Sequence, residues 1–220
     1  MSNVGQAISK GLEFASKVGQ ECEALSLLLR QEINHLLEYP SLSQIYMPGD
    51  KWSHSYQTDD KGWVYTGVAW SLELTPKNKQ DVTRYLSFQI ALLCDNPEGG
   101  MCSEPLLHIN FWSDPINYAG DCYMGFEMHG IAPACLALLK EGKARLFRWA
   151  DNEGGAGQWT YSLRLADVRG LDDLRALIAR PVEQLLIEPD EDKEPFAQLD
   201  KVVVYSSVDD MPDYYRVVSN

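Results

Sequence analysis

Between Trp63 and Met128 apolar residues recur at every second position, and this rhythm constrains the fold more than any other feature of the chain. The first set comprises Val64, Thr66, Val68, Trp70, Leu72 and Leu74. Later sets are Leu86, Phe88, Ile90, Leu92 and Cys94, then Leu107, Ile109 and Phe111, then Cys122, Met124, Phe126 and Met128. A period of two is typical of strands with one buried and one polar face. The pattern therefore predicts an antiparallel meander.

The same rhythm bears on the two cysteines in CDNPEGGMC, residues 94–102. Directly opposed residues of an antiparallel pair share a face, and the apolar positions are even-numbered before this turn but odd-numbered after it. Cys94 should then point inward and Cys102 outward, so we predict neither a disulfide nor a shared metal, unless a bulge at Pro105 resets the phase. All five cysteines are interpreted as small apolar residues in a reducing compartment.

The N-terminal segment instead has a helical period. Its apolar stripe consists of Val4, Ile8, Gly11, Ala15, Val18, Cys22, Leu25, Leu29 and Leu36, with Glu32 as the one polar residue in register. This stripe predicts one helix over 3–38, which would be roughly 50 Å long at about 1.5 Å per residue. Such a helix must either cross the whole domain or overhang it and meet a partner.

We favour packing of this helix on the core, with the small residues Gly11 and Ala15 allowing close approach to a sheet or another helix. A homodimer formed through the N-terminal helix is the alternative, because an apolar stripe alone does not distinguish the two arrangements.

The rest of the chain shows weaker patterns. Residues 39–62 have no apolar period and are predicted to form a long loop that contains His54. Strands are expected throughout 63–166, including a hairpin around DNEGGAGQ, which a strand follows instead of the helix that a phosphate-binding loop requires.

Residues 171–187 should form a second helix with Pro181 kinking it, 188–196 an acidic linker, and 201–207 a last strand. These patterns predict a single α+β domain over 1–220. In it, the long N-terminal helix packs on a mostly antiparallel meander of about six to seven strands.

Charge and hydropathy exclude some classes of function. The chain has 32 acidic and 19 basic residues, a net charge of -13, which disfavours direct binding of nucleic acid. No segment approaches the roughly 18 to 20 apolar residues that a membrane span needs. The first residues lack the continuous apolar centre of a signal peptide. We therefore expect a cytoplasmic protein without a membrane contact.

One polar face of the predicted sheet attracts attention. If 106–112 pairs with 121–129 so that Ile109 faces Met124, the outward side chains include His108, Asn110, Asp121, Tyr123, Glu127 and His129. A histidine near a carboxylate can serve general acid–base catalysis, or a metal site where two histidines converge. The same residues would also occur on an ordinary solvated face, which is the interpretation we favour.

No specific catalytic motif stands out, and the sequence predicts no cofactor and no metal. The charge, the long helix and the many aromatic residues favour a non-enzymatic, acidic, cytoplasmic protein-binding protein. It would be of the adaptor, chaperone or inhibitor (immunity) type, with a basic protein as partner. The alternative is a metal-assisted hydrolase or nuclease-like enzyme that uses the polar face of 106–112 and 121–129. A third hypothesis is a small-molecule sensor with its pocket between sheet and helices.

Overall fold

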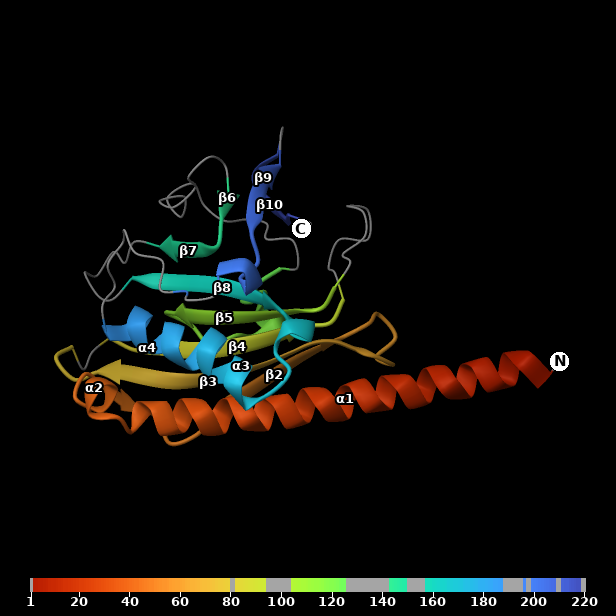
Figure 1. Ribbon diagram of the computed structural model, residues 1–220, viewed down its shortest axis with the longest axis horizontal. Coiled ribbons are helices and arrows are strands. Elements are labelled where there is room, and N and C mark those ends of the chain that lie inside the picture. Colours follow the sequence, from red (N-terminus) through yellow and green to blue (C-terminus); the bar gives the residue numbers. More distant parts are fainter. Residues whose placement is uncertain are drawn as a thin grey trace.

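The computed structural model describes residues 2–79, 82–93, 104–125, 143–149, 157–187, 196, 199–208 and 211–218. The chain has the predicted α+β fold, with a long N-terminal helix, α1 (Ser2–Leu37), on a mostly antiparallel sheet (Figure 1). This seven-stranded sheet has the order β1-β3-β4-β5-β8-β7, and β2 also pairs with β3. Its strands are β1 (Tyr46–Pro48), β2 (Ser53–Thr58), β3 (Tyr65–Pro76), β4 (Arg84–Ala91), β5 (Leu106–Trp112), β7 (Leu146–Trp149) and β8 (Gln158–Arg164).

A second sheet of three strands has the order β10-β9-β6. Its strands are β6 (Lys143–Ala144), β9 (Tyr205–Val208) and β10 (Met211–Val217). The last predicted strand therefore begins at Tyr205 and not at residue 201. The reason is that the preceding backbone bonds to β8 instead, since Val202 forms a bridge with Leu163 and the Val203 N–H donates to the Ser162 carbonyl at 2.9 Å.

The predicted faces of β3, β4 and β5 are confirmed. Trp70 lies opposite Phe88, and Phe88 lies opposite Ile109. These residues belong to one buried apolar cluster, which also contains Leu72, Leu86 and Phe111. Cys94, Cys102 and the turn between them lie outside the described residues.

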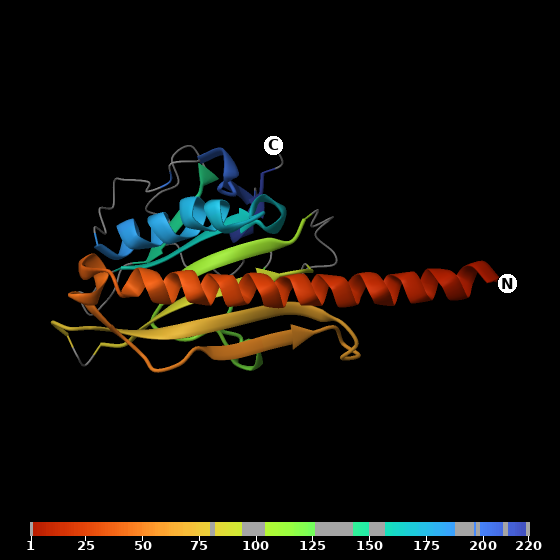
Figure 2. The same cartoon turned by 60° about the horizontal axis from the view of Figure 1, so that its bottom comes forward.

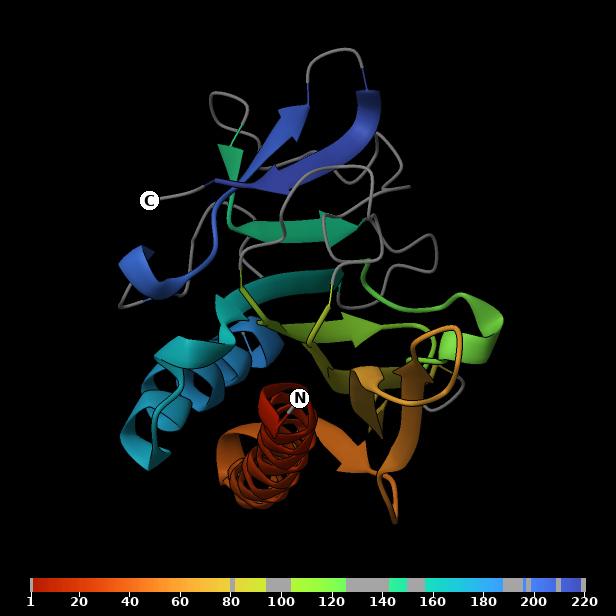
Figure 3. The same ribbon diagram turned by 90° about the vertical axis from the view of Figure 1, so that its right-hand side faces the viewer.

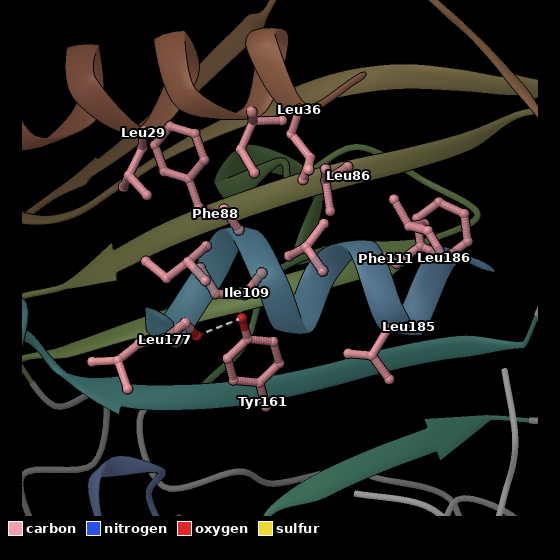
Figure 4. Close-up of a cluster of buried hydrophobic side chains, with 14 of the residues drawn as sticks. Leu29, Leu36, Leu86, Phe88, Ile109, Phe111, Tyr161, Leu177, Leu185 and Leu186 are labelled. Carbon is pink, nitrogen blue, oxygen red and sulfur yellow. Dashed lines mark hydrogen bonds between the residues drawn. The ribbon is translucent and has the colours of Figure 1, made fainter. Parts of the chain in front are cut away.

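Helices cover this apolar face of the sheet (Figure 3). One is the C-terminal half of α1, and the others are the consecutive segments α3 (Leu171–Leu174), η4 (Arg175–Ala179) and α4 (Arg180–Ile187). Figure 4 shows Leu29 and Leu36 of α1 and Leu177, Leu185 and Leu186 of the second helix directed toward the sheet. The predicted helix over 171–187 is thus present.

The continuous helix formed by α3, η4 and α4, which we call the second helix, contains a π-helical turn, η4, just before Pro181. Proline has no N–H, so the carbonyl of Leu177, four residues earlier, lacks its usual helical donor. The buried Tyr161 hydroxyl of β8 donates to this carbonyl at 3.0 Å (Figure 4). The strand thereby provides the hydrogen bond that the proline removes from the helix.

The prediction of a loop over 39–62 is wrong. This segment contains a short helix, α2 (Pro40–Ser43), and the strands β1 and β2, which line up along the outer edge of β3. β2 has the sequence SHSYQT and is largely exposed or half-buried. Its strand conformation is stabilised by pairing with β3 and not by burial of one face. An alternation of apolar residues is therefore not needed.

The long helix packs on the domain through its second half only. Residues 4–17 are all exposed, whereas Cys22, Leu29, Ile33 and Leu36 are buried. Figure 2 shows the N-terminal part extending beyond the sheet. Gly11 and Ala15, which we expected in a close contact, are exposed, and a Cβ added at Gly11 would meet no atom within 4 Å.

Glu32, the polar residue in the apolar stripe, ties α1 to the second helix. Its carboxylate accepts two hydrogen bonds from the Arg175 guanidinium, at 2.8 and 3.1 Å. This bonding holds the pKa of Glu32 below its ordinary value. The charged residue therefore marks the rim of the helix–helix contact.

Replacing Tyr161 by Phe should destabilise the fold by about 1–3 kcal/mol, because the buried Leu177 carbonyl then has no donor. Urea unfolding would measure this loss. The matched control is Tyr46→Phe, whose hydroxyl donates to the Leu186 carbonyl at a longer 3.4 Å and near the helix end. Equal losses in the two variants would contradict the special role of Tyr161.

Candidate functional site

His108 and Asn110 of the predicted polar face are completely buried. The proposed pairing of 106–112 with 121–129 is wrong, since β5 pairs with β4 on one side and β8 on the other. His108 lies opposite Gln89 and Ser162, and Asn110 lies opposite Ser87 and Thr160. β5 is therefore a central strand, with no free edge for 121–129.

The other predicted residues of this face do not join His108. Asp121 is an exposed residue with a left-handed backbone (φ 53°), directly after the short helix η1 (Tyr118–Gly120). Tyr123 is half-buried, with its ring 4.9 Å from that of Tyr118. Glu127 and His129 lie outside the described residues. A functional role for this set stays a prediction.

Residues 116–124 cover the polar face of the sheet through backbone hydrogen bonds. Gln89 donates to the Met124 carbonyl at 2.7 Å and accepts from the Met124 N–H at 2.9 Å. The Ile116 N–H donates to the Ser71 hydroxyl, which also accepts from Ser87 at 2.7 Å. The expectation that this face is solvated is wrong, because strand side chains here bond to a covering segment instead of water.

Nearer β8 the same face packs against the small sheet and the residues before it, since Val203, Tyr205 and Tyr215 cluster with Leu106 and Phe147. The centre of the face is thus buried, with polar side chains on β3, β4, β5 and β8 and apolar ones toward β7. Polar pairs within it include Thr160, which donates to Asn110 at 2.9 Å.

His108 takes part in a buried chain of hydrogen-bonding groups. Its Nδ1 lies 2.7 Å from the Ser162 hydroxyl, to which the Tyr205 hydroxyl donates at 3.0 Å. Burial lowers the pKa of His108 to about 3, so the ring is neutral at physiological pH. The spacing resembles that of a nucleophile and a base, but both side chains are fully buried, which favours a structural role.

The Nε2 of His108 and the Nδ2 of Asn110 have no hydrogen-bond partner among the described residues. Within the same residues, no group of three or more His, Cys, Asp or Glu side chains is arranged to hold a metal ion.

A surface site lies between α1 and the strands β2 and β3, and the hypothesis of a pocket between sheet and helices named none of its residues. It is a cleft of about 560 Å³, lined by Ser16, Gly19, Gln20, Cys22, Glu23, His54, Tyr56, Tyr65, Val68, Trp70 and Leu92. Gly19 leaves the helix surface open here, since a Cβ at this position would meet no atom within 4 Å. His54, which was interpreted as a loop residue, is one of its walls.

The strand side of this cleft is a series of aromatic rings in edge-on and tilted contact. The Tyr65 and Tyr56 centroids lie 5.4 Å apart, and His54 lies 5.7 Å from Tyr56 and 5.2 Å from Trp70. Trp70 then stacks on the core residue Phe88 at 5.2 Å. Such contacts are worth about 0.5–1.5 kcal/mol per pair beyond area burial, so the cleft wall is firmly held.

The turn of the β2–β3 hairpin carries a further aromatic residue, which is not one of the residues that line the cleft. Trp63 is 83% exposed and lies two residues before Tyr65. The Asp59 carboxylate fixes its backbone, accepting from the Trp63 N–H and from the Val64 N–H at 2.8 Å, and Gly62 supplies the positive φ of the turn. These hydrogen bonds lower the pKa of Asp59, and the bond from the Val64 N–H has the largest effect.

The cleft is suited to binding and not to covalent chemistry. Burial, followed by the charges of Glu23 and Glu21, raises the pKa of the Cys22 thiol, which is therefore a poor nucleophile. Glu23 is the one Asp, Glu, Lys or Arg residue among those that line the cleft. The site combines aromatic surface with a single carboxylate.

Comparisons of the chain with protein-family models, with curated proteins and with solved structures gave no match. Within the described part of the chain, none of the helices combines the length and the apolar character needed to span a membrane.

The buried His108 predicts a specific pH dependence of stability. The unfolded chain binds a proton as pH falls through about 6.5, but the folded chain does not until pH approaches about 3. Stability should therefore decrease with falling pH in this window, by up to about 1.4 kcal/mol per pH unit from this residue alone.

Urea unfolding of wild type and His108→Asn between pH 7 and pH 4.5 would isolate this contribution, because the carboxylates titrate in both proteins. The stability difference between the two should narrow, or reverse, as pH falls. Parallel curves would show that His108 is not held neutral by the fold.

Proposed function

We propose that this chain is a non-enzymatic, cytoplasmic protein-binding protein of the adaptor, chaperone or inhibitor type. The cleft between α1 and the β2–β3 hairpin is its docking site, and the occupant is an amphipathic segment of a basic protein. The observation that carries the proposal is an aromatic cleft of about 560 Å³ whose two tyrosines, Tyr56 and Tyr65, are more than half exposed.

The aromatic content supports protein binding over binding of a polar metabolite. Tyr and Trp are enriched at the centres of protein interfaces, where they bury large areas with little loss of side-chain entropy. Tyr56 and Tyr65 at the cleft are 55% and 57% exposed, respectively. Contiguous exposed aromatic surface of this kind typically marks an interaction site.

The charges near the cleft support a basic partner. Glu23 lines it and Glu21 is close by on α1, while the hairpin turn holds Asp59 and Asp60 against Lys61. The chain as a whole carries -13. Such a field attracts a segment with Lys or Arg beside its apolar anchors and accelerates its association.

The alternative of a hydrolase on the face of His108 receives less support. Its histidine is fully buried and bonded to Ser162, with a covering segment above the neighbouring Gln89. A catalytic group requires access for substrate, which the described residues around His108 do not offer.

Two synthetic amphipathic helical peptides with the same leucine face test the docking site, one with Lys and one with Glu on the polar face. The Lys peptide should bind at least about tenfold more tightly, equivalent to about 1.4 kcal/mol, with the difference shrinking at high salt. Fluorescence anisotropy of labelled peptides measures both affinities. Equal affinities would contradict a basic occupant.

Gly19→Leu should fill the cleft and weaken binding of the Lys peptide at least about tenfold. The variant should still fold, because leucine is a better helix former than glycine. The matched control is Ser9→Leu, which adds the same side chain to α1 away from the cleft. Affinity capture from native extract should recover a stoichiometric basic partner with wild type and Ser9→Leu but not with Gly19→Leu. Recovery with all three would exclude the cleft as the docking site.

A further inference from the structure

The exposed N-terminal part of α1, residues 4–17, is a second surface without a partner among the described residues, and we call it the arm. Its large apolar side chains are Val4, Ile8, Leu12 and Phe14, which are 60–70% exposed. An isolated helix of this length is marginal in water, and Gly5 and Gly11 weaken it further by up to about 1 kcal/mol each. The arm therefore has both an apolar face and a need for packing.

The apolar face of the arm continues the face that α1 buries in the domain. At about 100° per residue, Val4, Ile8 and Ala15 lie in line with the buried Cys22, Leu29 and Ile33. Leu12 and Phe14 lie on the two flanks of this stripe. The apolar stripe thus continues beyond the end of the sheet, where Figure 2 shows the helix extending past the domain.

We propose that the arm pairs antiparallel with the arm of a second copy of this chain. The stripe is large in its first half, with Val4 and Ile8, and small in its second half, with Gly11 and Ala15. Reversing one copy places Val4 opposite Ala15 and Ile8 opposite Gly11, so that each large residue meets a small one. This complementarity is a property of two identical arms related by a two-fold axis.

Parallel pairing does not have this fit. It would set Val4 against Val4 and Ile8 against Ile8, then Gly11 against Gly11 and Ala15 against Ala15. The helices would be held apart at one end and leave gaps at the other, and unfilled gaps lose contact energy.

Charge favours the same arrangement. Residues 2–20 carry Lys10, Lys17 and Glu13, a net of +1, so the remainder of the chain carries -14. In the antiparallel pair, the two acidic domains begin about 25 Å apart along the helix axis at about 1.5 Å per residue, roughly three Debye lengths at physiological salt. Parallel pairing would bring them side by side.

The proposed overlap covers residues 4–15 and leaves the docking cleft open, because the cleft begins at Ser16. Self-association and partner binding are therefore separable, and each can fail without the other. This separation determines the choice of variants.

Sedimentation velocity over about a hundredfold range of protein concentration should show a reversible monomer–dimer equilibrium for wild type. Ile8→Glu should weaken the dimer at least about tenfold, whereas Gln6→Glu, with the same charge about 160° away around the helix, should behave as wild type. Ile8→Glu should still bind the Lys peptide normally. A wild type that stays monomeric throughout, or equal effects of the two substitutions, would overturn the proposal and leave the arm to a different protein.

Disulfide trapping tests the direction of the pair. A mixture of Val4→Cys and Ala15→Cys proteins should form the mixed disulfide in preference to either symmetric product, with wild type as the background for the native cysteines. Predominance of the Val4→Cys symmetric product would overturn antiparallel pairing.

Discussion

The register across β3, β4, β5 and β8 is the constraint on which the rest of the structure depends. One row of opposed residues is Trp70, Phe88, Ile109 and Tyr161, and the next row is Ser71, Ser87, Asn110 and Thr160. The first row meets the helices, and the second meets residues 116–124 and the small sheet. Because a slip of one residue would exchange the two rows, both faces specify the same register.

The apolar row was predictable from sequence and the polar row was not, for a physical reason. Apolar alternation has one stable outcome in water, namely burial, so it identified the strands and their inner face. Polar alternation has two outcomes, since Ser71 or Gln89 can bond to water or to a covering backbone. The segment that supplies that backbone gave a misleading signal, since the alternation of Cys122 and Met124 predicted a strand, whereas residues 121–125 form none. β2 escaped prediction because it has no apolar alternation, although it completes the edge of β3 and carries His54 and Tyr56 into the cleft.

The long helix shows a second limit of periodicity. Its 36 residues extend about 54 Å, whereas the 8 residues of β4 extend only about 27 Å, so part of the helix must overhang. The apolar stripe predicted the helix but not whether the core or a partner protein covers the stripe, because apolar residues are expected in both cases. The exposure of Val4 and Ile8, beside the burial of Leu29 and Leu36, locates the point at which the domain ends.

The two surfaces at this end of the molecule differ in a way that keeps them from competing. The acidic domain repels its own copies, so the near-neutral arm is the stretch through which two chains can approach at low cost. The cleft carries Glu23 within an aromatic wall and suits a segment of opposite charge, whereas the arm relies on the fit of large to small side chains. In the two proposed interactions, specificity would follow from repulsion as well as attraction, since the cleft would reject an acidic partner and the charge of the domains would disfavour a parallel second copy. The net charge, which by itself only disfavours binding of nucleic acid, thus acquires a positional meaning in the proposed pairing, because the arm carries none of the acidic excess.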